Sequence, residues 1–176
     1  MGMGHPFVSC GIELLCRVSF KFKMMGLVML KLFDWPPVWL GLGVIAAGGL
    51  ARAVPFGLFG AAGDVGGGIL VATGLCLMAL AVWEMGRVRT TVIPRRAASR
   101  LVTAGVFGFS RNPIYLGDAL VLIGACLMFD SVLGLLLVPA FVWIINTRFI
   151  DGEEAHLTAA FGDDYREWCA NVRRWV

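Results

Sequence analysis

The sequence predicts an all-α integral membrane protein with about four transmembrane helices, and three observations lead to this fold class. Of the 176 residues, 59% are hydrophobic and only 15% are charged, against roughly 25% charged residues in soluble domains. Apolar runs of the length that crosses a bilayer, about 18 residues or more, recur along the chain. Basic residues gather between these runs, as they do in the cytoplasmic segments of membrane proteins.

The first 34 residues are expected to form a separate segment before a single domain that covers residues 35–176. Basic side chains interrupt the short apolar pieces of this segment, a pattern that suits an amphipathic helix at the membrane interface. A signal peptide and a true start at Met24 or Met25 are alternatives that the sequence leaves open.

Four transmembrane helices are expected in the domain. The first two are long apolar stretches, and one arginine, Arg52, lies near the far end of the first. The other two form a hairpin with its turn at Asp130-Ser131, and Pro139 is expected to kink the second leg. Glycines in the first two spans predict close helix packing. The predicted spans are residues 37–58, 65–84, 116–130 and 131–150.

The basic residues also predict the orientation. The loop 86–115 contains six arginines and no acidic residue, so the positive-inside rule places it in the cytoplasm. Four spans then bring the tail, residues 151–176, to the same side. Within this tail, Phe161-Gly162-Asp163-Asp164-Tyr165 is typical of a helix that stops and restarts. An aromatic stripe at helical spacing follows, and we expect it to cover the cytoplasmic face.

Two polar segments flank the hairpin, so antiparallel helices would bring them together at one membrane face. The first contains Arg111, Asn112 and Tyr115, and the second contains Glu153 and Glu154. A guanidinium can bind a carboxylate in a planar fork. Carboxylates can hold an amine, ribose hydroxyls or a sulfonium, and tyrosine can stack on a base or a cation. These residue types also permit a plain role as a topology anchor and the start of a solvated helix.

Several function classes are not expected. The sequence has no P-loop, no GxSxG and no HExxH. Its five cysteines and two histidines show no metal-ligand spacing, so we predict no metal site. Nucleic-acid binding is not expected either. A transporter would need ionisable residues near the bilayer midplane, and the predicted spans offer almost none.

The order of the motifs resembles the isoprenylcysteine carboxyl methyltransferase family, the membrane methyltransferases that include phospholipid methyltransferases. Residues 101–107 run into Ser110-Arg111-Asn112-Pro113-Ile114-Tyr115-Leu116-Gly117. The hairpin, Glu153-Glu154, Phe161-Gly162-Asp163-Asp164-Tyr165 and Val172-Arg173-Arg174-Trp175 then follow in the family's order. The resemblance covers about residues 90–176.

The resemblance implies S-adenosylmethionine as the methyl donor, bound on the cytoplasmic side without a Rossmann domain. Arg173 and Arg174 are weaker candidates for binding the acceptor, because they suit the steering of an anionic group, and membrane-surface binding explains them equally well. No catalytic residue is assigned. Asn112 replaces the histidine of eukaryotic members, as in the bacterial branch, and is expected only to form hydrogen bonds. The implied cofactor-binding residues are Arg111, Asn112, Pro113, Tyr115, Glu153 and Glu154, with Arg111, Tyr115 and Glu154 as positioning candidates.

The expected function is S-adenosylmethionine-dependent methyl transfer at a membrane, most simply a bacterial inner membrane with the site facing the cytoplasm. The expected acceptor is lipophilic, an isoprenoid or prenylcysteine-like carboxylate. A phospholipid, a small amine or a thiol is the alternative acceptor. A non-catalytic membrane scaffold is the alternative from another class, and the sequence leaves the oligomeric state open.

Overall fold

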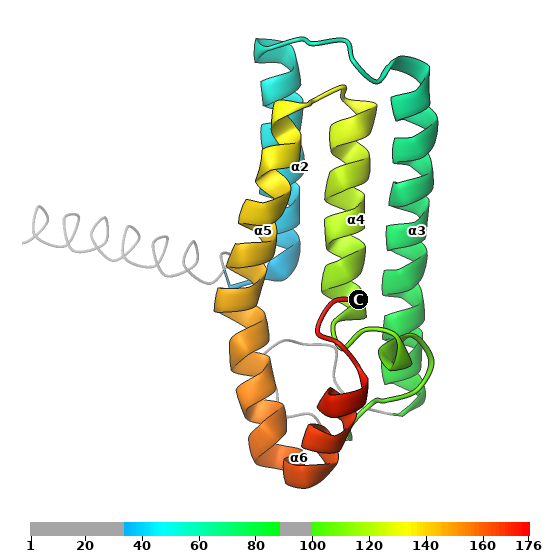
Figure 1. Cartoon of the computed structure of the whole chain (residues 1–176), viewed down its shortest axis with the longest axis vertical. Helices are drawn as coiled ribbons and strands as arrows, with labels where there is room; N and C mark the ends of the chain where they lie inside the picture. Colours follow the sequence, from blue (N-terminus) through cyan, green and yellow to red (C-terminus); the bar gives the residue numbers. More distant parts are fainter. Residues whose placement is uncertain (1–33, 89–99) are drawn as a thin grey trace, which may run out of the picture. The chain divides into compact units, whose positions relative to one another are not determined.

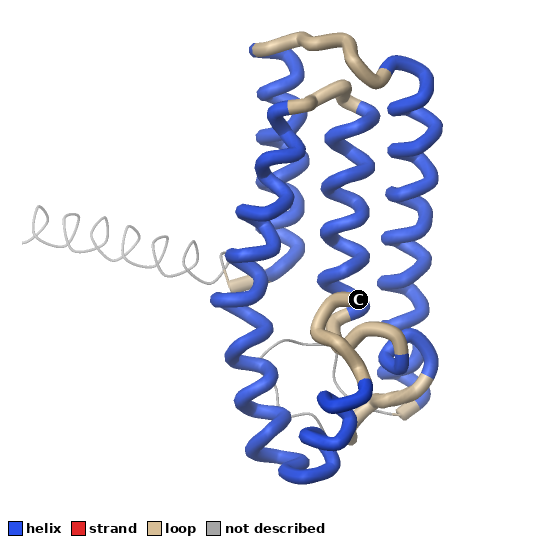
Figure 2. Tube along the Cα trace, in the orientation of Figure 1, coloured by secondary structure: helices blue, strands red, loops and turns tan. Residues whose placement is uncertain are grey.

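The computed structural model describes residues 34–88 and 100–176. Over these residues the chain is helical apart from short connections, and no strand is present in them (Figure 2). The all-α class is therefore confirmed for the described part. The chain divides into two compact units, Met1–Val38 and Trp39–Val176. The predicted interfacial segment falls almost entirely outside the described residues.

Figure 1 shows α3, α4 and α5 running side by side within the larger unit, with α6 continuing beyond α5. Two helical stretches, Gly60–Arg87 and Leu133–Asn171, are long and apolar enough to cross a membrane, whereas α4 is apolar but shorter. Four spans remain a prediction. The elements are α2 (Pro36–Ala53), α3 (Gly60–Arg87), η1 (Gly105–Gly108), α4 (Pro113–Met128), η2 (Leu133–Leu136), α5 (Leu137–Ile145), η3 (Asn146–Ile150) and α6 (Asp151–Asn171).

The helix ends differ from the predicted spans for local reasons. The first predicted span continues to residue 58, but α2 ends at Ala53. Pro55 explains this end, because a residue that precedes proline is disfavoured in the helical region. In contrast, α3 begins five residues before the predicted second span, at Gly60. Its start is held by a residue far away in the sequence, in the hairpin turn.

The hairpin turn is where the sequence predicts it, and Asp130 has a second role there. Asp130 has a positive φ of 53°, a conformation that Asp and Asn tolerate better than most residues. Its Oδ1 accepts hydrogen bonds from the backbone N–H groups of Leu58 and Phe59, at 2.9 and 2.8 Å. Its Oδ2 accepts one from Gly60 at 3.4 Å. The turn therefore satisfies N–H groups that a helix start leaves without internal partners.

Glycines bring α3 and α4 into close contact. A Cβ atom at Gly67 would lie 2.5 Å from the carbonyl oxygen of Gly124, and one at Gly117 would lie 2.7 Å from that of Gly74. Neither position can accept a side chain without moving the partner backbone. The predicted close packing is thus confirmed at Gly67 and Gly74. Where lipid surrounds helices, such contact by small residues is a main source of their association.

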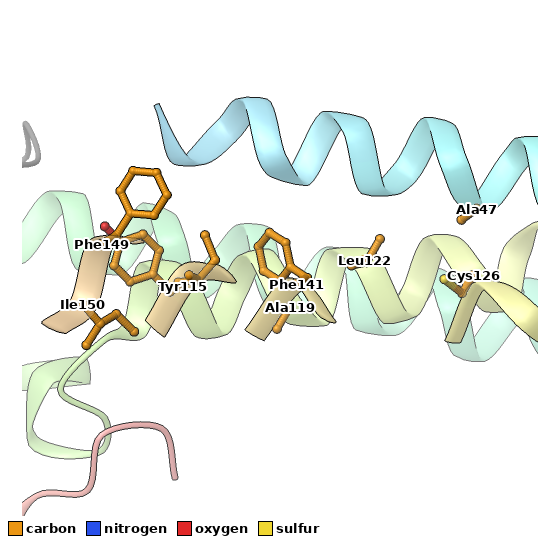
Figure 3. Packing of buried hydrophobic residues seen from close by; sticks show 9 residues of the cluster. Ala47, Tyr115, Ala119, Leu122, Cys126, Phe141, Phe149 and Ile150 are labelled. Atoms are coloured by element: carbon orange, nitrogen blue, oxygen red, sulfur yellow. The ribbon is translucent and has the colours of Figure 1, made fainter. Parts of the chain in front are cut away.

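The core lies on the opposite side of α4. Tyr115, Ala119, Leu122 and Cys126 of α4 face aromatic and aliphatic side chains of α5 and η3 (Figure 3). Their spacing of three or four residues places them on one face of the helix. Tyr115 stands at the N-terminal end of this row, so the core reaches the predicted polar segment.

The second leg of the hairpin begins with the 3₁₀ turn η2 and continues as α5. Pro139 lies in the first turn of α5, where a missing N–H removes few internal bonds, and the kink expected there stays a prediction. The helix does not stop at Ile150, the predicted end of the span, but continues through the π-helical turn η3 into α6. The predicted stop and restart in the tail is confirmed by Gly162, with φ 54° and ψ −117°.

Candidate functional site

Three segments that are distant in the sequence meet at one end of the larger unit. They are residues 110–115 at the start of α4, residues 151–154 at the start of α6, and the last residues of the chain. In Figure 1 the C-terminus returns to the lower end of α4. The two predicted polar segments therefore do lie together. The tail, which the sequence predicted only to cover the cytoplasmic face, is a third segment of the site.

The tail is attached through its backbone. After α6, Val172 is extended, with φ −123° and ψ 128°, so the next carbonyl groups are free to accept bonds from a neighbouring segment. The carbonyl oxygen of Arg173 accepts the N–H of Arg111 at 3.0 Å. That of Arg174 accepts Asn112 Nδ2 at 3.0 Å and Ser110 Oγ at 3.4 Å. Asn112 thus forms the kind of hydrogen bond that its residue type predicts.

Glu154 is at the centre of the charges. Its Oε1 lies 3.4 Å from Arg111 Nη2 and accepts Arg174 Nε at 3.1 Å, while Arg174 Nη2 bonds its Oε2. Arg174 Nη1 also donates to Asp151 at 3.0 Å. The hydrogen bond with Glu154 is the main cause that raises the pKa of Arg174. One carboxylate thus joins the first polar segment to the tail.

This arrangement separates the two arginines that were predicted as acceptor contacts. Arg174 is bound by Glu154 and Asp151, and is therefore a structural member of the site. Arg173 contributes its carbonyl oxygen, but its side chain is exposed. No salt bridge or hydrogen bond of its guanidinium is found within residues 34–88 and 100–176.

Arg111 is surrounded by groups that the sequence did not single out. Its Nη1 donates to Cys169 Sγ at 2.6 Å, and Cys169 also bonds the hydroxyl of Tyr165. Burial, followed by this bond and the charge of Glu154, raises the pKa of Tyr165, so its phenol stays neutral. Cys169 follows Tyr165 by four residues, about one helical turn. This spacing is the feature of the sequence that could have predicted their contact.

Two buried N–H donors at this end lack a hydrogen-bond partner in the described part of the chain. They are Arg111 Nε and Trp168 Nε1. The Trp168 ring lies 5.8 Å from that of Tyr165. Buried donors in folded proteins are nearly always bonded. This pair therefore suits a ligand with acceptor atoms.

The remaining predicted residues occupy the inner side of the site. The Tyr115 hydroxyl donates to Glu153 Oε1 at 2.9 Å, and its ring lies 6.4 Å from that of Phe149. Pro113 is fully buried as the first residue of α4, where its fixed φ favours a helix start. Trp175 Nε1 donates to Asn146 at 3.2 Å, which places the last aromatic residue against the core.

Residues 64–164, more than half of the chain, match the family described as phospholipid methyltransferase. The chain belongs to this family. The matched region contains most of α3, all of α4 and α5, and the first part of α6, and it ends before Cys169 and the C-terminal arginines. The predicted membership of this group of membrane methyltransferases is confirmed.

Two similar proteins cover shorter parts of the chain. The Protein-S-isoprenylcysteine O-methyltransferase of Schizosaccharomyces pombe is 31% identical over 72 residues, which are 41% of this chain and 30% of that protein. An uncharacterized protein of Haemophilus influenzae is 38% identical over 63 residues, 36% of this chain and 100% of that protein. The chain thus spans less than a third of the S. pombe relative. No solved structure matches this chain.

Proposed function

We propose that this chain is an S-adenosylmethionine-dependent methyltransferase that acts at a membrane on a lipophilic acceptor. The supporting observation is the convergence of residues 110–115, residues 151–154 and the C-terminal tail within hydrogen-bonding distance. Family membership indicates the class of reaction, and the convergence of the three segments indicates where in the protein we propose that it occurs. The proposed site residues are Arg111, Asn112, Pro113, Tyr115, Glu153 and Glu154.

The side chains at this place fit the proposed cofactor. When bound, S-adenosylmethionine supplies a methyl group on a positively charged sulfur. The carboxylates of Glu153 and Glu154 would favour positive charge and can accept hydrogen bonds from ribose hydroxyls or an ammonium group. Arg111 Nε and Trp168 Nε1 are buried donors that a carboxylate or a ring nitrogen would satisfy.

The protein's own contribution is positioning. Glu154 is fixed by two guanidiniums, and Glu153 is fixed by the Tyr115 hydroxyl. Groups held in this way keep donor and acceptor in a near-attack arrangement, which can supply a large part of a rate enhancement. The tail covers part of the same groups, so that the Glu154 side chain is 19% exposed, and partial removal of water strengthens electrostatic interactions.

The orientation with the site in the cytoplasm belongs to the proposal, and two contacts support it. Arg87 lies 4.8 Å from the Trp83 ring near the end of α3, and Arg148 lies 5.4 Å from the Trp39 ring. Trp and basic residues are typical of the membrane interface. The first pair lies at the end of α3, and the second joins the start of α2 to η3, next to the site. Together with the arginines of loop 86–115, they favour a bacterial inner membrane with this end inside.

The test measures cofactor binding and methyl transfer on the full chain in detergent. We expect S-adenosylhomocysteine to bind in calorimetry. Glu154→Gln should weaken this binding about tenfold or more, since a hydrogen bond to a charged group contributes about 1.5–3 kcal/mol. Asp163→Asn is the matched control, because Asp163 is 93% exposed and pairs only with Arg166 among the described residues.

Methyl transfer is then assayed with labelled S-adenosylmethionine and a total membrane lipid extract. Label in the lipid fraction, reduced by Glu154→Gln and by Tyr115→Phe but not by Asp163→Asn, is the expected result. Absence of both binding and label in the wild-type protein would overturn the proposal in favour of a non-catalytic scaffold.

A further inference from the structure

A buried acid lies next to the proposed site and has no part in it. Asp118 belongs to α4, three residues after Tyr115, which places it about 4.5 Å further along the helix. It is 1% exposed, and its Oδ1 has no hydrogen-bond partner. In the described part of the chain, no hydrogen bond or salt bridge is found for either oxygen.

The other acidic side chains near the site have hydrogen-bond or salt-bridge partners. Glu154 is held by two arginines, and Glu153 by Tyr115. Glu84, near the end of α3, lies 3.6 Å from Arg87. A carboxyl group buried without a partner costs free energy that a neutral apolar residue would not. An ionisable residue of this kind inside a membrane helix is therefore a functional candidate.

The place of Asp118 on α4 directs it away from the lipid. Gly117 and Gly124 form the row of α4 that contacts α3. Tyr115 and Leu122 belong to the row that faces the core. On a helical surface Asp118 lies between these two rows, so both neighbours cover it. Asp118 is three residues further from the start of α4 than Tyr115, and it therefore lies further into the predicted span 116–130.

We infer that Asp118 is the residue of this chain that holds an amine acceptor, the alternative acceptor class, and takes up its proton. This inference rests on the proposed function. The ammonium group of such an acceptor would supply the charge and the N–H donor that the buried Oδ1 of Asp118 lacks.

The same carboxylate solves the proton problem of an amine acceptor. A protonated amine has no lone pair for a methyl group until it loses a proton. At Asp118 the N–H bond of the ammonium breaks and an O–H bond forms at Oδ1, which leaves a neutral amine beside a neutral acid. The proton returns to water after the product has left. Glu153 and Glu154 suit this step less well, because their oxygens are bound by Tyr115 and by arginines.

The test uses Asp118→Asn, which keeps the shape and removes the charge. Ser131→Ala is the matched control, since Ser131 is also 1% exposed with an unpartnered Oγ, but lies in the turn at the other end of α4. Phosphatidylethanolamine and phosphatidylglycerol in mixed micelles are the probes. For Asp118→Asn we expect S-adenosylhomocysteine affinity within twofold of wild type. We expect kcat/KM for phosphatidylethanolamine to fall at least tenfold, with a higher KM for the lipid. The control should change neither value.

A second variant separates a binding role from a structural one. Asp118→Leu should raise the melting temperature, because it removes an unpaired buried acid, and it should also remove preferential retention of phosphatidylethanolamine over phosphatidylglycerol in native mass spectrometry. A lower melting temperature would show that Asp118 is structural and would overturn the inference. So would label on carboxylate lipids, or unchanged kcat/KM in Asp118→Asn. Failure of the proposed function is distinct, because the wild-type protein would then not bind S-adenosylhomocysteine.

Discussion

Replacing Arg174 by alanine should release the C-terminal tail from the site. The Arg174 side chain makes three hydrogen bonds, two to Glu154 and one to Asp151. A hydrogen bond to a charged group contributes about 1.5–3 kcal/mol, while an exposed ion pair contributes about 0.2–1 kcal/mol. Arg174 is 35% exposed and Glu154 19%, so an intermediate value of about 1–2 kcal/mol applies. This value corresponds to roughly a 5- to 30-fold increase in tail opening.

Hydrogen exchange at the Arg111 amide measures this opening, because that N–H donates to the carbonyl oxygen of Arg173 in the tail. Under conditions where exchange reports the opening equilibrium, Arg174→Ala should accelerate it by the factor above. Arg173→Ala is the matched control: it removes the same charge one residue away but keeps the carbonyl, and the Arg173 side chain is exposed. Equal acceleration in both variants would refute the view that the Arg174 ion pairs hold the tail.

Two further predictions concern the scaffold. Gly67→Ala should destabilise the protein by about 1–3 kcal/mol through overpacking. Gly68→Ala is the control and should not destabilise it, because a Cβ atom at Gly68 meets open space. Equal melting temperatures of the two variants would contradict the described contact of α3 and α4. The hydrogen bond from Phe59 is the main cause that lowers the pKa of Asp130, so Asp130 stabilises the fold above its unfolded pKa of about 3.9, and this contribution is lost as the pH falls through the lower folded pKa. Thermal unfolding in detergent from about pH 7 to about pH 3 should show less acid sensitivity in Asp130→Asn than in the wild type, and an unchanged acid dependence would argue against the cap.

The sequence was most informative where one element constrains another. A hairpin with a turn at Asp130 must bring its two ends together. The proximity of Tyr115 and Glu153 could therefore be predicted from the order of the elements alone. Gly162 was equally readable, because a glycine inside an otherwise helical polar stretch marks a break. Both predictions depend on local residue types that leave the backbone few alternatives.

Features that depend on tertiary contact were not predictable in the same way. The change from apolar to acidic residues at Asp151 led to the predicted end of the span, but residue type alone does not indicate that the helix continues past it through η3 into α6. The carbonyl bonds of Arg173 and Arg174 carry no sequence signature, because any residue has a carbonyl group. The contact between Cys169 and Arg111 could not be predicted either, since nothing in the sequence around Cys169 indicates that Arg111 lies beside it.

The contacts of Arg111 connect the tail to the proposed cofactor site thermodynamically. Its N–H binds the tail backbone, and its side chain binds Glu154, which in turn binds Arg174 of the tail. Under the proposed function, a ligand that engages Arg111 or Glu154 must therefore alter the free energy of tail closure. Linkage requires the reverse effect to be equal, so whatever factor the tail contributes to ligand affinity, the ligand contributes to tail closure. The C-terminal residues, which lie beyond the region matched to the family, thus become part of the binding equilibrium.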